Sequence, residues 1–465
     1  MNENKIPEKY TYIILTFTLI SIISCIILNA FLFYGFMASI IFSIYLCRKS
    51  GFSIIELFNM IKRGLYECKS LFILMALIGA MIPIWMSSGV VPTMLYYGLK
   101  YMKGTNFLFS AFILTSVVSI FMGTSFGTIS SVGIALLALS KIFGIPNYIL
   151  LGAIVSGAFI ADKSSPISNL FNLTLETVKI EYKEAITSML KTLLPTCFIS
   201  ASVYYFIGKK YSVVIENSNI NNFMYAINSN FTVSPLILLL PLSIIIMLFL
   251  GIKMLKSVFL ALIAGIVVSI VFQREGFNHI INAILNGYNI NTNFVQLNTV
   301  LVSGGMISMI SVLLIIAGAV SLSSIFQETG LIIPVIKRIT SKIKSSEELI
   351  LKTGLISGAL TIISDQSVGI ILPGKFLINK YKELKVKNCI LARTMADTGT
   401  IIAPLIPWNV NSLFIFITTG ISTISYAPYA VLCYVSPIIT FIFAFLHKFQ
   451  GRKQTKEIQV KNTIK

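Results

Sequence analysis

The chain has 465 residues, of which 56% are hydrophobic and 11% are charged, whereas a soluble globular protein is usually about 25% charged. This composition excludes a soluble protein and predicts an all-α polytopic membrane protein, because the alternating pattern of membrane β-barrel strands is absent. The formal net charge of +19 does not indicate nucleic-acid binding, since Lys and Arg gather in a few short stretches. The sequence has no C-x-x-C motif and no P-loop, so we expect neither an enzyme nor a cofactor.

The basic stretches predict the orientation of the chain in the membrane. The apolar run after residue 9 lacks a small-residue cleavage site, so we interpret it as a first span and not as a signal peptide. The positive-inside rule places the most basic stretches, together with both termini, in the cytoplasm. These stretches are residues 48–69, 337–344, 375–387 and the tail from 448. The predicted location is the cytoplasmic membrane.

The first half of the chain, residues 1–208, is predicted to hold five spans and a re-entrant hairpin at about 104–145. The hairpin tip is Gly123–Gly133, rich in Gly, Ser and Thr. A helix at about 148–178 follows, and it is broken at Asp162-Lys-Ser-Ser-Pro-Ile-Ser-Asn169. Residues 209–234 form a polar linker to the second half.

The second half, residues 235–447, shows the same pattern, and a basic cytoplasmic tail at 448–465 follows it. A segment at about 345–378 begins and ends on the cytoplasmic side. At ~1.5 Å rise per residue its two arms are too short to cross the membrane as a pair, which predicts a re-entrant hairpin with Asp365-Gln-Ser at its tip. A second broken helix is predicted at about 388–424, with its break at Asp397-Thr-Gly-Thr and Pro404.

Three landmarks recur in the same order and at nearly the same spacing in the two halves. Gly89 corresponds to Gly330, the tip at Thr124 to that at Asp365, and Asp162 to Asp397. The two hairpins start from opposite sides, so the halves are predicted to be two inverted-topology repeats. The expected fold has about ten transmembrane helices, two re-entrant hairpins and broken helices, an arrangement typical of secondary transporters.

The chain has three aspartates, Asp162, Asp365 and Asp397, and all three lie at these breaks. An ionisable residue at membrane depth is costly and is a functional-site hypothesis by default. A proline kink with a buried, hydrogen-bonded Asp would explain one break, but two matched breaks favour a cation site. The residues predicted to bind the cation or proton are Asp162, Asp365, Asp397, Thr124, Ser125, Ser165, Ser168, Asn169, Gln366, Thr398 and Thr400. The residues predicted to support them are Lys163, Arg393, Gly123, Gly127, Pro166, Gly399, Pro404 and Asn409.

Burial disfavours the charged form of a carboxylate, so such a group can hold a proton in one state and a metal ion in another. We expect Asp162 and Asp397 to be the Na⁺ ligands. Lys163 is a candidate internal counter-ion that occupies the site when the cation leaves. Arg393 lies one helical turn before Asp397 and is expected either to pair with it or to anchor the cytoplasmic end of the span.

These motifs resemble the NhaC family of sodium/proton antiporters. The resemblance is carried by Gly123-Thr-Ser-Phe-Gly-Thr, by the stretch 157–168, by Asp365-Gln, and by Asp397-Thr-Gly-Thr with Pro404-Leu-Ile-Pro-Trp-Asn409. It implies an antiporter that exchanges Na⁺ for H⁺, both as transported ions. Some relatives exchange malate with protons for sodium and lactate, and others carry amino acids.

The chain departs from the family pattern at Asn169 and Ala396, where relatives commonly have acids. The stoichiometry therefore stays open, as does a small organic anion or amino acid carried by the same fold. An ion channel is less favoured, because the breaks are typical of closed cation pockets and not of a continuous pore. The expected partners are the lipid bilayer, Na⁺ and H⁺, and a homodimer is compatible with the sequence.

Overall fold

A computed structural model describes residues 6–28, 30–101, 105–140, 143–166, 168–211, 217–250, 252–294, 297–298, 301–341 and 343–445. Within these ranges the protein is helical, and its extended structure is limited to an isolated antiparallel bridge between Asn289 and Val302. Long apolar runs form helices because a helix satisfies its own backbone hydrogen bonds where water is absent.

Seven helices of the described chain are long and apolar enough to cross a membrane, or up to ten if each bent helix pair is one span. The protein is therefore an all-helical membrane protein, and the prediction of about ten spans lies at the upper end of this range. Six of the seven are α1 Glu8–Ile27, α2 Leu32–Lys49, α4 Lys69–Ser87, α12 Tyr182–Lys209, α15 Met254–Val271 and α18 Met306–Glu328.

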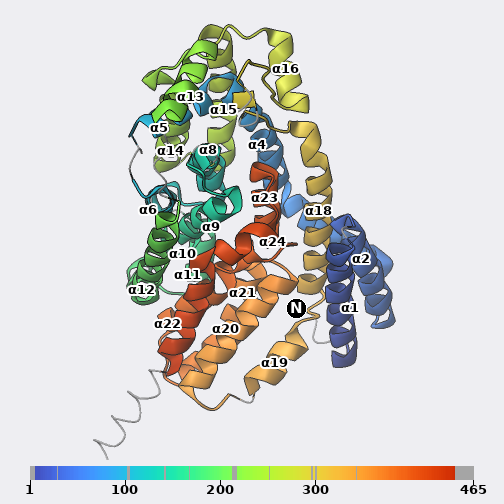
Figure 1. The fold of residues 1–465 in the computed structure, drawn as a ribbon. Coiled ribbons are helices and arrows are strands. Elements are labelled where there is room, and N and C mark those ends of the chain that lie inside the picture. Colours follow the sequence, from blue (N-terminus) through green and yellow to red (C-terminus); the bar gives the residue numbers. More distant parts are fainter. Residues whose placement is uncertain are drawn as a thin grey trace, which may run out of the picture.

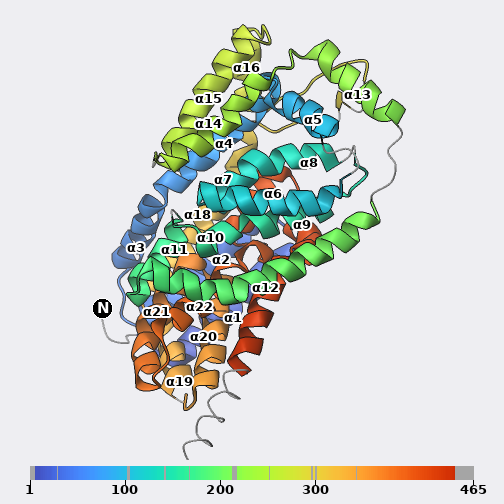
Figure 2. The same cartoon turned by 90° about the vertical axis from the view of Figure 1, so that its left-hand side faces the viewer.

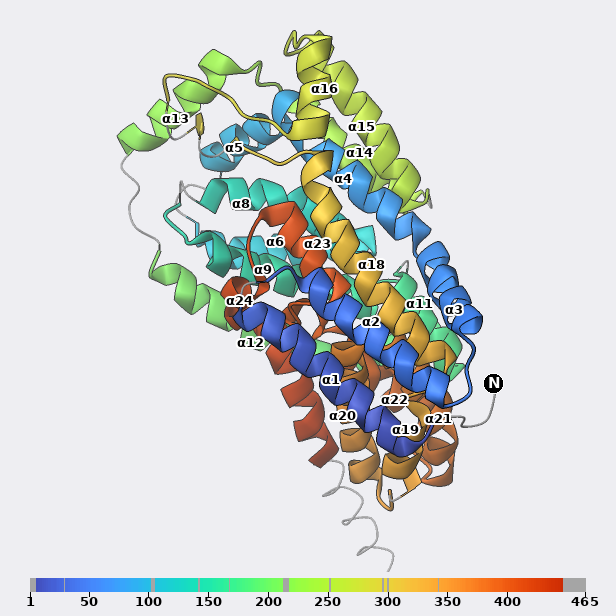
Figure 3. The same cartoon turned by 90° about the vertical axis from the view of Figure 1, so that its right-hand side faces the viewer.

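Helices α1, α2, α4, α15 and α18 pack against one another along one side of the molecule, and we call these five helices the outer layer. The amphipathic helix α3 Ile54–Glu67 packs against α18 in the same layer, as Figure 3 shows. Small residues allow the close approach: a Cβ on Gly79 would lie 2.5 Å from Met309 Cγ, and one on Gly64 would lie 2.4 Å from Ser324 Oγ.

Around the first predicted hairpin, α6 and the helices that follow it are joined by a short turn. Helix α6 Phe107–Met122 ends at Gly123, whose φ of +67° is readily adopted by glycine. The chain turns through Thr124 and at once resumes as α7 Ser125–Thr128, a π-helical turn η1 Ile129–Gly133 and α8 Ile134–Ser140. Most of the predicted tip, Gly123–Gly133, is thus helical, and the hydroxyls of Thr128 and Ser130 donate hydrogen bonds to carbonyls of their own helix.

The second hairpin consists of α20 Ser346–Ile363 and α21 Gln366–Glu383, which pack against each other. Its end was predicted at about 378, but α21 continues through Lys375 and Lys380 to Glu383. Lys375 and Lys380 therefore belong to a helix. A helix can hold them near the membrane surface because a long Lys side chain can extend towards water.

The two segments predicted to be broken helices are each divided into shorter helical segments. The first consists of α9 Asn147–Ala158, α10 Ile160–Ser164 and α11 Asn169–Val178. The second consists of α22 Asn388–Met395, a π-helical turn η3 Ala396–Thr400, a 3₁₀ turn η4 Ala403–Leu405 and α23 Val410–Thr419. The axis bends by 42° between residues 388–405 and 410–419. Pro404 lacks a backbone N–H and interrupts the regular hydrogen bonding at this bend.

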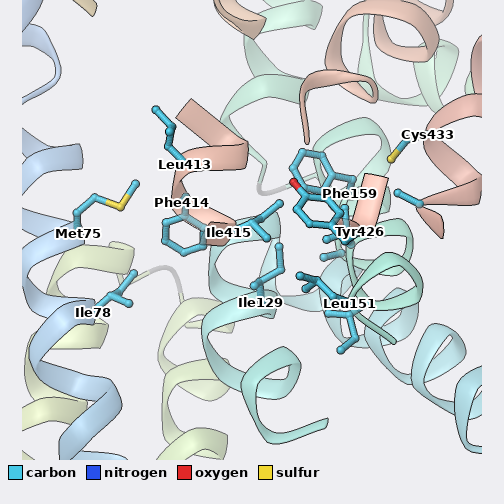
Figure 4. Packing of buried hydrophobic residues seen from close by; sticks show 14 of the residues in the cluster. Met75, Ile78, Ile129, Leu151, Phe159, Leu413, Phe414, Ile415, Tyr426 and Cys433 are labelled. Atoms are coloured by element: carbon cyan, nitrogen blue, oxygen red, sulfur yellow. The ribbon is translucent and has the colours of Figure 1, made fainter. Parts of the chain in front are cut away.

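The hairpins and broken helices form an inner unit against the outer layer. Figure 2 shows α6, α8 and α9 stacked above the long helix α12. The Phe414 ring on α23 stacks on Phe126 of the first hairpin, with a centroid distance of 4.2 Å. Figure 4 shows Phe414 and Ile415 between Met75 of α4 and Ile129 of η1, so the buried apolar core joins the outer layer to the inner unit.

The two ends of the molecule differ in the segments that they hold (Figure 1). One end carries α5 Val90–Tyr101, α13 Asn217–Asn230, η2 Pro235–Leu238, α14 Leu239–Phe249 and α16 Phe277–Asn286. The predicted linker therefore contains a helix, α13. The other end carries α19 Ile333–Ser341 with α20 and α22. After α23 come α24 Thr423–Tyr426, a turn η5 Ala427–Tyr429 and a last helix, Val431–Phe445. The predicted tail at 448–465 lies outside the described residues.

Candidate functional site

Asp397 lies in the π-helical turn η3 and has no exposed surface. Three hydroxyl groups donate hydrogen bonds to its carboxylate: Thr192 of α12 at 2.8 Å, and Ser436 and Thr440 of the last helix at 2.9 and 2.5 Å. A π-helical turn is rare and is often found at functional sites. Here it lies where three helices converge on one carboxylate.

Lys163 completes this cluster from the other broken helix. Its side chain is fully buried, its ammonium forms an ion pair with Asp397, and it donates a hydrogen bond to Thr192 Oγ1 at 3.3 Å. In the described chain it thus pairs with the aspartate of the opposite half and not with its sequence neighbour Asp162. The ion pair and three hydroxyl donors leave the Asp397 charge well compensated, as a buried charge requires.

Asp162, next to Lys163 in α10, has a different environment. Its carboxylate is 6% exposed and accepts one side-chain hydrogen bond, from Ser125 Oγ at 2.7 Å. No cationic side chain pairs with it among the residues that the structure describes. The first hairpin and the first broken helix therefore meet at a buried carboxylate that lacks a positive partner.

Asp365 is the N-cap of α21, and its Oδ1 accepts a hydrogen bond from the Val368 N–H at 2.9 Å. Its side chain is half-buried, so it is the least enclosed of the three aspartates. The neighbouring Gln366 is buried and joins the second hairpin to the second break: its Nε2 donates to the Thr400 carbonyl at 2.6 Å, and Asn411 Nδ2 donates to its Oε1 at 3.0 Å. Asp365 thus caps α21, and within the described residues it shares no hydrogen-bond partner with Asp162 or Asp397.

Most of the remaining predicted site residues contact backbone. Ser165 donates to the Ile120 carbonyl at 2.7 Å, Thr398 donates to the Thr394 carbonyl at 2.7 Å, and the Ser168 Oγ accepts from the Phe171 N–H at 3.4 Å. These hydroxyls stabilise helix ends and turns. The Thr400 hydroxyl differs: it is buried and has no hydrogen-bond partner within the described ranges.

The residues predicted to support the site are mainly close-packing and capping residues. A Cβ on Gly399 would lie 2.2 Å from Ser357 Oγ of α20, and one on Gly127 would lie 2.8 Å from Thr124 Cγ2. The Pro404 carbonyl accepts a hydrogen bond from the Tyr426 hydroxyl at 2.5 Å. Asn409 caps α23 and donates to the Thr361 carbonyl at 3.3 Å.

The structure leaves three of the predicted residues outside the buried clusters. Asn169 and Pro166 are exposed at the start of α11. Arg393 was expected to pair with Asp397 or to anchor the helix end, but no ion pair of Arg393 occurs in the described chain. It is 4% exposed and its guanidinium lies 5.8 Å from the centroid of the Phe443 ring. The ion pair of Asp397 is formed with Lys163 instead.

Thr192, Ser436 and Thr440 were not among the residues predicted from the sequence. These hydroxyls lie on apolar helices, where Ser and Thr commonly bond to their own backbone. The spacing of hydroxyl residues could have indicated them. Ser188, Thr192 and Thr196 are four residues apart in α12, and so are Ser436 and Thr440 in the last helix. Such a spacing places the hydroxyls along one face of a helix.

The sequence model of the "Na+/H+ antiporter family" matches residues 157–448, which include α10 and α11 of the first broken helix, the second hairpin and the second broken helix. This chain belongs to the Na⁺/H⁺ antiporter family. It is similar to the Na⁺/H⁺ antiporter NhaC of Alkalihalophilus pseudofirmus, with 32% identity over 389 residues, 83% of this chain and 84% of the relative. It is also similar to the NhaC of Bacillus subtilis, with 29% identity over 81% of this chain and 84% of the relative.

Other similar proteins carry names with different substrates. The malate-2H⁺/Na⁺-lactate antiporter of Bacillus subtilis is 27% identical over 86% of this chain and 86% of its own length. The arginine/ornithine antiporter ArcD of Halobacterium salinarum is 30% identical over 85% of this chain and 82% of its own length. Family membership therefore makes the chain a secondary transporter of the membrane and not an enzyme, while the relatives alone do not decide its substrate.

Proposed function

We propose that this member of the Na⁺/H⁺ antiporter family exchanges Na⁺ for H⁺, and that Asp162 is the carboxylate that holds each ion in turn. One observation carries the proposal. Asp162 is buried beside Ser125 without a positive partner in the described chain, whereas the equally buried Asp397 is compensated by Lys163. The two carboxylates therefore have different roles in this conformation.

The charges at the two breaks support an exchange mechanism. Asp162, Lys163 and Asp397 together carry one net negative charge when all three are ionised. An uncompensated charge is costly in a low-dielectric environment, so the inner unit is expected to move only when Asp162 holds a proton or a Na⁺ ion. Two ions that compete for one carboxylate, with the empty site unable to cross, give obligatory exchange.

Oxygen ligands suit Na⁺, a hard cation. Ser125 Oγ is already next to Asp162. The Thr400 hydroxyl is buried without a hydrogen-bond partner in the described structure, on the broken helix whose turn η3 packs against α10. We therefore propose Asp162 and Ser125 as the first Na⁺ ligands, with Thr400 as a further candidate. Asp397 would join them only in a conformation in which Lys163 has withdrawn.

The sequence repeats suggest how access alternates. We propose that the two halves are inverted repeats and that the inner unit of hairpins and broken helices moves against the outer layer. The close contact of Phe414 with Phe126 within the inner unit supports a single moving body. We also propose that both termini lie in the cytoplasm, and a homodimer is compatible with the sequence.

An organic substrate is the second candidate, because two similar proteins are named as a malate/lactate and an arginine/ornithine antiporter. The deciding experiment is the Na⁺-induced collapse of a pH gradient in everted vesicles that contain the overproduced chain. We expect Na⁺ alone to collapse the gradient. If collapse requires malate, lactate, arginine or ornithine as well as Na⁺, the chain is an organic-substrate exchanger and the proposal is wrong.

A further inference from the structure

A cavity of about 1120 Å³ lies at the end of the molecule that holds α20 and α22, away from Asp162 and Ser125. It is bounded by the first turns of α12, α20 and α22 and by Phe443 of the last helix. Two glutamates at the start of α12 and five cationic side chains line it. The cationic residues are Lys183, Lys191, Lys385, Lys387 and Arg393. The lining is therefore positively charged overall.

Arg393 lines this cavity and forms no ion pair among the residues that the structure describes. Arg393 is only 4% exposed, and its Nε has no hydrogen-bond partner within the described residues. The Phe443 ring, whose centroid lies 5.8 Å from the guanidinium, offers only the weak attraction of a cation for an aromatic face. A buried charge that lacks a partner is costly, so this guanidinium favours an anion in the cavity.

The backbone around the cavity favours the same kind of ligand. The N-cap residues of α12 and α22 are Glu181 and Lys387, and neither side chain makes a capping hydrogen bond. The first backbone N–H groups of these helices thus add the partial positive charge of helix N-termini to the charges of the lysines. The planar guanidinium of an arginine matches the two oxygens of a carboxylate or phosphate better than a spherical anion such as chloride.

We propose that this cavity is a binding site for a small oxyanion, a carboxylate or a phosphate, with Arg393 as its main ligand. The segment after the last described helix, residues 446–465, carries six basic residues and one acidic residue, so its charge does not suit this cavity. The lysines of the lining, Lys183, Lys191, Lys385 and Lys387, supply further positive charge. The site is separate from the exchange carboxylate, so it does not depend on the proposed function.

Binding is tested on the purified full chain in detergent, without any ion gradient. The melting temperature is measured with increasing succinate and with increasing inorganic phosphate, each compared with sodium chloride at equal ionic strength and equal Na⁺. A third arm compares nanodiscs of phosphatidylcholine with nanodiscs that also contain phosphatidylglycerol, to distinguish a lipid headgroup from a free anion. We expect a saturable rise with at least one oxyanion, because a ligand that binds only the folded state stabilises it.

The variants Arg393→Gln and Lys191→Gln are expected to weaken this response, Arg393→Gln by about tenfold or more in midpoint concentration, since a charge-assisted hydrogen bond is lost. The matched control is Lys375→Gln, an exposed residue of α21 outside the cavity, which should respond as the wild type does. Lys191→Gln keeps the test decisive if Arg393→Gln does not fold. The proposal is overturned if no oxyanion acts differently from chloride, or if the folded variants respond as strongly as the wild type.

Discussion

At the scale of single residues, the two buried aspartates of the broken helices differ in how their charge is compensated. Asp397 has an ion pair with Lys163 and three hydroxyl donors, whereas Asp162 has Ser125. This asymmetry arises because Lys163 extends from one half of the chain to the other. It makes Asp162 the better candidate for a site that gains and loses a cation.

The first residue-scale prediction concerns Lys163. The variant Lys163→Gln should leave the fully buried Asp397 charge without a cation, and breaking such a pair costs about 3–5 kcal/mol. We expect a clearly lower melting temperature in detergent. The double variant Lys163→Gln/Asp397→Asn should recover most of the loss, because neither charge is then left alone. The exposed Lys375→Gln serves as the control, and a Lys163→Gln protein that melts like the wild type would contradict the ion pair.

The sequence located the aspartates but not their partners. Asp162 and Asp397 stand out because a charge in an apolar run is rare. Thr192, Ser436 and Thr440 do not stand out, because hydroxyls are common in apolar helices and their orientation depends on tertiary packing. The pairing of Lys163 with Asp397 could not be predicted for the same reason: adjacency in sequence does not set the direction in which a side chain extends.

At the scale of elements, glycine, proline and polar clusters were good predictors of where helices break. The break around Asp162 was predicted within a helix at 148–178, and the structure has α9, α10 and α11 over Asn147–Val178. The end of α21 was not predicted, because a basic stretch was interpreted as a loop although it continues the helix to Glu383. Charge indicates the side of the membrane, and it does not by itself end a helix.

The element-scale prediction concerns the contact of α6 with α9. A Cβ on Gly157 would lie 2.1 Å from Thr115 Oγ1 and 2.8 Å from the Phe112 carbonyl oxygen, so the helices would have to separate. Gly157→Ala should therefore destabilise the protein by about 1–3 kcal/mol, the usual cost of overpacking. The matched control is Gly276→Ala, where the added Cβ would meet no atom within 4 Å. Equal melting temperatures for the two variants would show that the contact of α6 with α9 is looser than described.

At the scale of the whole molecule, contacts place the first and the last described helix at the same end of the molecule. Glu8 of α1 forms an ion pair with Arg338 of α19, and Phe443 of the last helix lies against Arg393 of α22. Helices α13 and α16 lie at the opposite end (Figure 1). The basic stretches predict that the end of the molecule with α19, α20 and α22 faces the cytoplasm.

Reporter fusions test this orientation. We expect green fluorescent protein fused after Phe445 to fluoresce and alkaline phosphatase fused there to be inactive, since the first requires the cytoplasm and the second the outer side. The same reporters fused after Tyr211, beyond the end of α12, should give the opposite pattern. Identical patterns at the two positions would refute the predicted orientation.

The central claim is that Asp162 is the exchange carboxylate, and the most direct test is Na⁺-driven proton flux of Asp162→Asn in everted vesicles. The control is Glu383→Gln, which removes a carboxylate from the exposed end of α21. Flux is normalised to the amount of folded protein, measured by fluorescence-detected size exclusion. The account predicts that Asp162→Asn folds but shows no Na⁺-driven flux, while Glu383→Gln keeps the wild-type rate. Wild-type flux in folded Asp162→Asn would contradict it.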